Sequence, residues 1–219
     1  MQLEALVFDF DGTILDTETP EFESWQQIYR DHGAQLEISD WGRGIGTWGA
    51  FDPWHDLETK IGRTLNKEPI ALAHRARVKA AIGALKLLPG VLDLLESAKA
   101  AGIKLAIASS SNREWVEGWA QKLGVRHYFS VTSTKDDVLR VKPDPALYLL
   151  ACEKLGVQPQ RALALEDSAN GAASALAAGL RCAVIPNPVT RTLEFPNGVF
   201  RLETLENVKL EALRALMNP

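Results

Sequence analysis

Short apolar runs alternate with helical patterns along most of the chain. Runs rich in Val, Ile and Ala predict buried strands, and apolar residues spaced three or four apart predict helices. This alternation favours βαβ units around a parallel sheet, so we predict an α/β fold. The expected strands are 3–10, 103–110, 128–133, 161–167, 181–186 and 199–202. The expected helices are 90–102, 112–124, 145–156, 168–179 and 207–217, with Ser111 or Asn112 capping the second.

The segment from about residue 17 to 88 interrupts this alternation. It shows helical patterns and no convincing strand. The first pattern begins with Thr19 as a candidate N-cap and Pro20 at the first helical position. A helical insertion after the first strand would lie over the C-terminal edge of the sheet, where open α/β sheets bind ligands. Its expected helices are 19–33, 55–65 and 69–83.

Size and charge narrow the class of protein. The chain has 219 residues, of which 46% are hydrophobic and 24% charged, enough to bury a substantial core. The net charge is −4 and no basic tract occurs, so we expect no nucleic-acid or anionic-membrane partner. We find no signal-peptide pattern and no apolar stretch near the roughly 18 residues of a membrane span. We therefore expect a cytoplasmic protein, with Cys152 and Cys182 as buried free thiols.

Four polar clusters stand at or beside the ends of predicted strands. Because the carboxyl ends of parallel strands share one edge of a sheet, these clusters can converge. Carboxylates without His or Cys suit Mg²⁺, and a Ser-rich turn entering a helix offers N–H groups to an anion. The sequence thus predicts a site for phosphate and magnesium. The clusters are Asp9 with Asp11, Ser109 to Ser111, Lys142, and Glu166 with Asp167.

Each cluster alone also has an ordinary structural interpretation. The two aspartates could be a helix cap and a turn residue, and the serines could be an N-cap run. Lys142 could lie in an exposed Lys-Pro turn, and the last two acids could complement a helix dipole. The occurrence of all four clusters together favours the functional interpretation.

Four motifs in order carry a resemblance to a known family. They are "DFDGT" (9–13), "ASSS" (108–111), "KPDP" (142–145) and "EDSANG" (166–171). The chain resembles the haloacid dehalogenase superfamily, specifically its phosphatases and phosphomutases with a small helical cap. "LDTE" and "EDSxxG" are most similar to the β-phosphoglucomutase, pseudouridine-phosphatase and deoxyglucose-phosphate-phosphatase group.

The resemblance covers nearly the whole chain and implies a domain organisation. It implies a Rossmann-like parallel sheet core with a helical cap inserted after the first strand. The expected catalytic core is 1–16 with 88–219, and the expected cap is 17–87. Two short linkers near 14–18 and 84–90 could form a hinge between them.

The resemblance also implies roles for the acidic residues. Asp9 would be the nucleophile that forms an aspartyl-phosphate, while its other oxygen binds Mg²⁺. Asp11 would protonate the leaving alkoxide and then activate water, and its backbone carbonyl would coordinate the metal. Asp167 would bind the metal directly, and Glu166 directly or through water.

The remaining motif residues would handle the phosphoryl group. Ser109 and the N–H of Ser110 would hold phosphoryl oxygens, and Lys142 would neutralise charge in the transition state. A general acid at Asp11 suits an alkoxide leaving group, whereas a departing halide needs no proton. The resemblance therefore favours phosphomonoester chemistry over dehalogenation.

Three functions are compatible with these residues. We expect a Mg²⁺-dependent phosphatase of a small phosphorylated metabolite, such as a sugar or nucleoside phosphate. The alternative is a sugar-phosphate mutase of the β-phosphoglucomutase type. Similar mutases carry a cap His where this chain has Glu21, and a cap Arg near Gly49, with Arg43 several residues earlier. The third is a catalytically silent, phosphate-sensing module, and for any of them a monomer is favoured.

A few cap residues are candidates for substrate contact. Trp48, in the turn-like "GRGIGTWG" (42–49), is the best candidate to face the substrate, and Arg43 could meet a second anionic group. We expect most cap tryptophans to be core residues. The four histidines show no metal-ligand spacing and receive no role; they are His32, His55, His74 and His127.

Overall fold

The computed structural model describes residues 2–218 and contains one parallel sheet. Its six strands lie in the order β3-β2-β1-β4-β5-β6, and every pairing is parallel, as the sequence predicts. In register, Leu6 of β1 lies between Leu105 of β2 and Leu163 of β4. The strands are β1 (Ala5–Phe8), β2 (Lys104–Ala108), β3 (Val131–Ser133), β4 (Ala162–Glu166), β5 (Arg181–Val184) and β6 (Phe200–Arg201).

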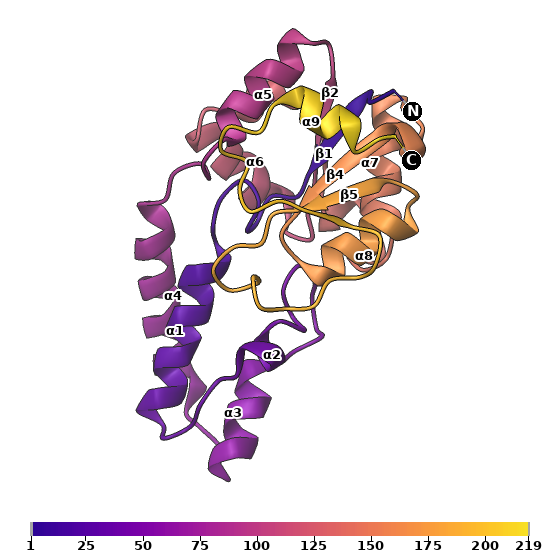
Figure 1. The fold of residues 1–219 in the computed structure, drawn as a ribbon. Coiled ribbons are helices and arrows are strands. Elements are labelled where there is room, and N and C mark those ends of the chain that lie inside the picture. Colours follow the sequence, from indigo (N-terminus) through magenta and orange to yellow (C-terminus); the bar gives the residue numbers. More distant parts are fainter. Residues whose placement is uncertain (1, 219) are drawn as a thin grey trace.

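Helices cover both faces of this sheet (Figure 1). Side chains alternate along β1, so Leu6 and Phe8 pack into one apolar cluster and Val7 into another. The first cluster is completed by α5 (Val91–Ala100), α6 (Arg113–Lys122) and α9 (Leu210–Ala215). The second is completed by α7 (Ala146–Leu155) and α8 (Ala169–Ala177). It contains Cys152 and Cys182, which are free and buried as predicted.

Four helices lie apart from the sheet, in the lower part of Figure 1. They form an apolar cluster of their own around Trp25, Tyr29 and Leu57, which Val189 joins from the loop after β5. In the described chain, residues 17–88 contain no strand, as predicted. The assignment of 17–87 as a helical cap domain stays a prediction. The helices are α1 (Glu18–Asp31), α2 (Ile38–Trp41), α3 (Pro53–Ile61) and α4 (Lys67–Gly83).

The predicted N-cap residue of helix α1, Thr19, is wrong. Helix α1 begins at Glu18, so Thr19 lies inside it. Asp16 accepts hydrogen bonds from the Thr19 N–H (3.1 Å) and hydroxyl (2.8 Å), so a carboxylate two residues before the helix serves its first turn. For α6, the structure decides between the two candidates: the Asn112 side chain accepts from the Trp115 N–H at 2.8 Å. Helix α2 was not predicted.

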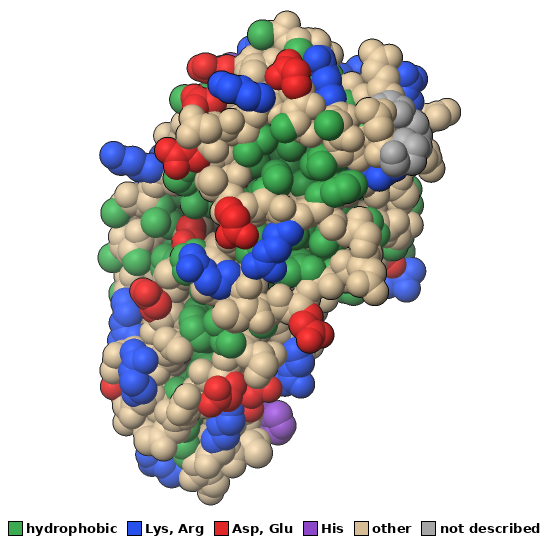
Figure 2. Space-filling view, in the orientation of Figure 1, with side chains coloured by type: hydrophobic (Ala, Val, Ile, Leu, Met, Phe, Trp, Pro, Cys, Tyr) green, Lys and Arg blue, Asp and Glu red, His purple; other side chains and the backbone are tan. Residues whose placement is uncertain are grey.

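Charged side chains are mixed over the face shown in Figure 2, while hydrophobic side chains gather on the sheet-bearing part above. Among residues 2–218, no helix combines the length and the apolar character that a membrane span needs.

Candidate active site

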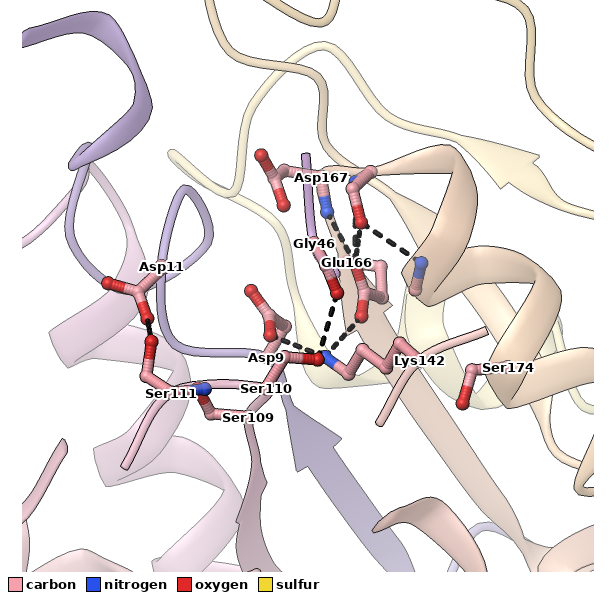
Figure 3. A network of polar contacts seen from close by, with 12 residues as sticks. Asp9, Asp11, Gly46, Ser109, Ser110, Ser111, Lys142, Glu166, Asp167 and Ser174 are labelled. Atoms are coloured by element: carbon pink, nitrogen blue, oxygen red, sulfur yellow. Dashed lines mark hydrogen bonds and ion pairs between the residues drawn. The ribbon is translucent and has the colours of Figure 1, made fainter. Parts of the chain in front are cut away.

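A buried lysine joins two acids at the C-terminal edge of the sheet (Figure 3). Asp9 follows β1 and Glu166 ends β4, and β1 and β4 are neighbours, so the two carboxylates emerge side by side. The Lys142 ammonium donates to Asp9 Oδ1 and, at 2.7 Å, to Glu166 Oε1. The side chains of Lys142 and Glu166 are fully buried. Tyr148 also donates its hydroxyl to Glu166 Oε1, at 2.7 Å.

The charges at this edge do not balance. The carboxyl groups of Asp9, Glu166 and Asp167 lie together, and the Lys142 ammonium forms ion pairs with the first two. Burial raises the pKa of the Asp9 carboxyl to about 8, against the opposing charge of Lys142. Burial also raises the pKa of Asp167 well above its ordinary value, with Asp9 and Glu166 adding to the rise. Burial alone would lower the pKa of Lys142, yet the two acids it contacts raise it above its ordinary value.

The acidic group fits a hard divalent cation. Carboxylate oxygens of Asp9, Glu166 and Asp167 all lie within 4.8 Å of one another. Asp167 Oδ2 accepts from the Asn187 amide at 2.7 Å, whereas its Oδ1 is buried without a hydrogen-bond partner. An unpaired carboxylate oxygen within a buried group of acids is the kind of donor that Mg²⁺ binds. The backbone adapts to this carboxylate at Gly12 (φ +88°), where a Cβ would lie 2.1 Å from Asp167 Oδ2.

The serine turn after β2 lies beside this group. Ser109 Oγ accepts from the Ser111 N–H at 3.0 Å, which shapes the turn into α6. Ser110 Oγ donates to the Gly46 carbonyl at 2.9 Å, so the turn touches the helical segment. Ser109 and Ser110 both line the cavity described below. Their predicted contacts with phosphoryl oxygens stay a prediction.

The Asp11 side chain lies outside the acidic group. Its Oδ1 accepts from the Thr17 hydroxyl at 3.0 Å and from the Trp115 indole N–H at 2.8 Å. Its Oδ2 accepts from the Ser111 hydroxyl at 2.6 Å, and Figure 3 shows the carboxylate turned toward Ser111. The predicted metal contact of Asp11 was assigned to its backbone carbonyl and stays a prediction. Trp115 was not among the predicted site residues.

A cavity of about 820 Å³ opens between the sheet edge and the helical segment. Asp9, Asp11 and the serine turn line one side, and Trp48, the predicted candidate for substrate contact, lines it too. Other lining residues were not predicted, among them Trp115 and three polar residues on α4, namely His74, Arg75 and Lys79. The spacing of the α4 residues along one helix face was the available signal. Arg43, offered as a candidate for a second anion, is not among the lining residues; it pairs with Asp40 at 3.8 Å.

A loop of the helical segment is docked on the sheet edge. The Trp48 indole N–H donates to the Ser110 carbonyl at 2.8 Å, and the Thr47 hydroxyl donates to the Lys142 carbonyl. From the other side, the Asn170 amide donates to the carbonyls of Ile45 (2.8 Å) and Arg43 (3.1 Å). Residues 43–48, the docked loop, therefore cover the lysine-linked acids.

Comparisons with known proteins agree with this geometry. The family model for haloacid dehalogenase-like hydrolases matches residues 3–179, a range that includes every predicted site residue. "Putative phosphatase YhcW" of Bacillus subtilis is 45% identical over 99% of this chain and 98% of its own length. A "Phosphorylated carbohydrates phosphatase" of Thermotoga maritima is 32% identical over 81% of this chain and 82% of its own. The crystal structure of CbbY from Rhodobacter sphaeroides in complex with phosphate has a TM-score of 0.69 at 33% identity, covering 94% of this chain and 96% of its own.

The fold and the site define a hydrolase whose acidic centre lies under a helical segment. The chain belongs to the haloacid dehalogenase-like hydrolases. It is an enzyme of the phosphoric monoester hydrolase class.

Proposed function

We propose that this enzyme is a Mg²⁺-dependent phosphatase that hydrolyses a small phosphorylated metabolite, a sugar or nucleoside phosphate, through an aspartyl-phosphate. The observation that carries the proposal is the Lys142 ammonium between Asp9 and Glu166, beside the unpaired Asp167 oxygen. Buried acids in this arrangement are costly unless a cation or a reaction partner compensates them.

Asp9 and Asp11 would carry the two half-reactions. An Asp9 oxygen forms a bond to phosphorus while the ester P–O bond breaks, and Asp11 gives its proton to the departing alkoxide. Water, losing a proton to Asp11, then attacks phosphorus and releases phosphate and Asp9. Lys142 is already hydrogen-bonded to Asp9 and would balance charge on the phosphoryl oxygens, which Ser109 and the Ser110 N–H would hold.

Magnesium would be held by Asp9, Glu166 and Asp167, together with the backbone carbonyl of Asp11. When bound, it would neutralise negative charge on the phosphoryl group and on the acids around it. The closeness of the three carboxylates and the unpaired Asp167 oxygen support this assignment.

The cavity supports a substrate larger than phosphate. A volume of about 820 Å³ leaves room for an organic group between Asp9 and helix α4. Among the relatives, one is named for phosphorylated carbohydrates, and a mutant of Rhodobacter sphaeroides CbbY was crystallised in complex with xylulose-(1,5)bisphosphate. The cations Arg75 and Lys79 line the same cavity and would meet a second anionic group on such a substrate.

Phosphate release from a panel of sugar, nucleoside and glycolyl phosphates, with Mg²⁺ or with EDTA, tests the proposal. We expect metal-dependent release that is abolished in Asp9→Asn. Isomerised glucose 1-phosphate with little free phosphate would instead make the protein a mutase. Binding that survives in Asp9→Asn, with no turnover in the wild type, would make it a phosphate-sensing module.

A further inference from the structure

A glutamate and a histidine form a fixed pair on the cavity wall contributed by the helical segment. Glu21 lies in the first turn of α1 and His74 lies on α4, and both line the cavity. Their side chains are 39% and 12% exposed, so the carboxylate is open and the ring beneath it is enclosed. The distance from His74 Nε2 to Glu21 Oε2 is 3.2 Å.

Contacts with Glu21, Ser24 and Trp25 hold the His74 ring in one orientation. Its Nδ1 lies 2.8 Å from Ser24 Oγ, which also accepts a hydrogen bond from the Arg77 guanidinium at 3.3 Å. The Trp25 ring packs against it with the centroids 4.9 Å apart. Because both ring nitrogens are engaged, His74 cannot turn without breaking a hydrogen bond. It therefore fixes the position of Glu21 Oε2.

The other oxygen of Glu21 is available to the cavity. Within residues 2–218, no hydrogen bond or ion pair occupies Glu21 Oε1. An ionised carboxylate accepts hydrogen bonds and donates none, so its natural partners are hydroxyl groups. A carboxylate also repels a second phosphate that approaches it directly.

We propose that Glu21, held by His74, is a specificity-determining residue that accepts a hydrogen bond from a hydroxyl group of the substrate. The inference rests on the proposed phosphatase and names its substrate class: a polyhydroxylated phosphate ester that spans the cavity from Asp9 to Glu21. His74 is a positioning residue that acts through Glu21. The cations on α4, Arg75 and Lys79, lie along the same wall and serve any further anionic group.

The test compares two phosphate esters that release the same kind of leaving group but differ in whether they carry hydroxyl groups. Glucose 6-phosphate and propyl phosphate both release an alkoxide, but propyl phosphate has no hydroxyl for Glu21. For Glu21→Gln we expect kcat/KM to fall about tenfold on glucose 6-phosphate, mainly through KM, because hydrogen bonds to charged groups have this strength. On propyl phosphate we expect less than about a twofold change, since no hydrogen bond to Glu21 is lost.

Two variants control for charge and for position. Glu23→Gln removes the same charge from an exposed site on the same helix, and we expect it to leave both substrates unaffected. His74→Ala leaves Glu21 in place but unheld, and we expect an intermediate loss of roughly threefold on glucose 6-phosphate alone. Equal losses on both substrates, or no loss on glucose 6-phosphate, would overturn the inference.

A binding measurement separates this inference from the proposed function. Calorimetric titration of glucose 6-phosphate into Asp9→Asn, with and without Glu21→Gln, requires no turnover. A weaker affinity of about tenfold in the double variant supports the inference even if the wild type releases no phosphate, a result that would refute only the phosphatase. Unchanged affinity refutes the role of Glu21 whatever the activity shows.

Discussion

Gly46 allows the docked loop to approach the sheet edge, and alanine at this position should prevent the approach. Gly46 has φ +75°, and a Cβ built there would lie 2.3 Å from Ser168 Oγ and 2.9 Å from Ser168 Cβ. Ser168 caps α8 by accepting from the Gly171 N–H at 3.0 Å, so its side chain is not free to move away. The loop must therefore lift.

The size of the effect follows from the contacts that lifting breaks. The loop would lose at least three of its hydrogen bonds: the Gly46 carbonyl to the Ser110 hydroxyl, the Trp48 indole to the Ser110 carbonyl, and the Ile45 carbonyl to the Asn170 amide. At about 1 kcal/mol net for each, the docked state loses roughly 3 kcal/mol. That corresponds to about a 100-fold smaller ratio of docked to undocked states, and kcat/KM falls by up to this factor if only the docked state is competent.

Gly49 provides the matched control for Gly46→Ala. Its φ is +79°, so alanine suffers the same backbone strain of about 1 to 2 kcal/mol, but no atom lies within 4 Å of the added Cβ. Steady-state kinetics and thermal melts of Gly46→Ala and Gly49→Ala separate strain from the clash. We expect similar melting temperatures but kcat/KM lower by about 30- to 100-fold in Gly46→Ala. Values of kcat/KM within twofold of each other would refute the reasoning.

Three further predictions concern the acids and the lysine. We expect Asp11→Asn to reduce kcat on alkyl phosphates far more than on p-nitrophenyl phosphate, whose leaving group hardly needs a proton; equal losses would contradict the general-acid role. We expect Mg²⁺ at about 100 times its Kd to stabilise the fold by roughly 2.7 kcal/mol in thermal melts, and Asp167→Asn to lose most of this gain; a full gain in the variant would place the ion elsewhere. We expect Lys142→Met to abolish turnover and to destabilise the fold by about 3 to 5 kcal/mol in denaturant titrations, because Asp9 and Glu166 lose a buried counter-charge. A variant as stable as the wild type would show that Asp9 and Glu166 are protonated when Lys142 is absent.

The sheet and the acidic centre were predictable because local patterns encode them. Apolar runs predict the strands, and parallel pairing brings their carboxyl ends together, so Asp9 and Glu166 could be placed at one edge from the sequence, whereas Lys142 was placed with them by the order of the family motifs. The start of helix α1 was predicted less accurately, because another side chain takes the role given to Thr19. Thr19 was predicted as the N-cap, whereas Asp16 accepts the hydrogen bond from the first turn.

Contacts between the helical segment and the sheet edge could not be predicted in the same way. No local pattern tells that Trp48 meets the Ser110 carbonyl or that His74 fixes Glu21, since these contacts join residues more than 50 positions apart. The Asp11 side chain is a similar case, because the Trp115 indole that holds it comes from another element 104 positions later.

The two buried cysteines make the protein suited to site-directed labelling. Burial raises the pKa of Cys152 to about 11 and that of Cys182 further above its ordinary value, so both remain unreactive thiols at neutral pH. A cysteine introduced at an exposed position would then be the thiol that a maleimide dye modifies. Leu72 on α4 (64% exposed) and Leu139 after β3 (fully exposed) are such positions, one in the helical segment and one beside the sheet. A dye pair at these two sites would test whether the cavity opens and closes during turnover, with no native cysteine to remove first.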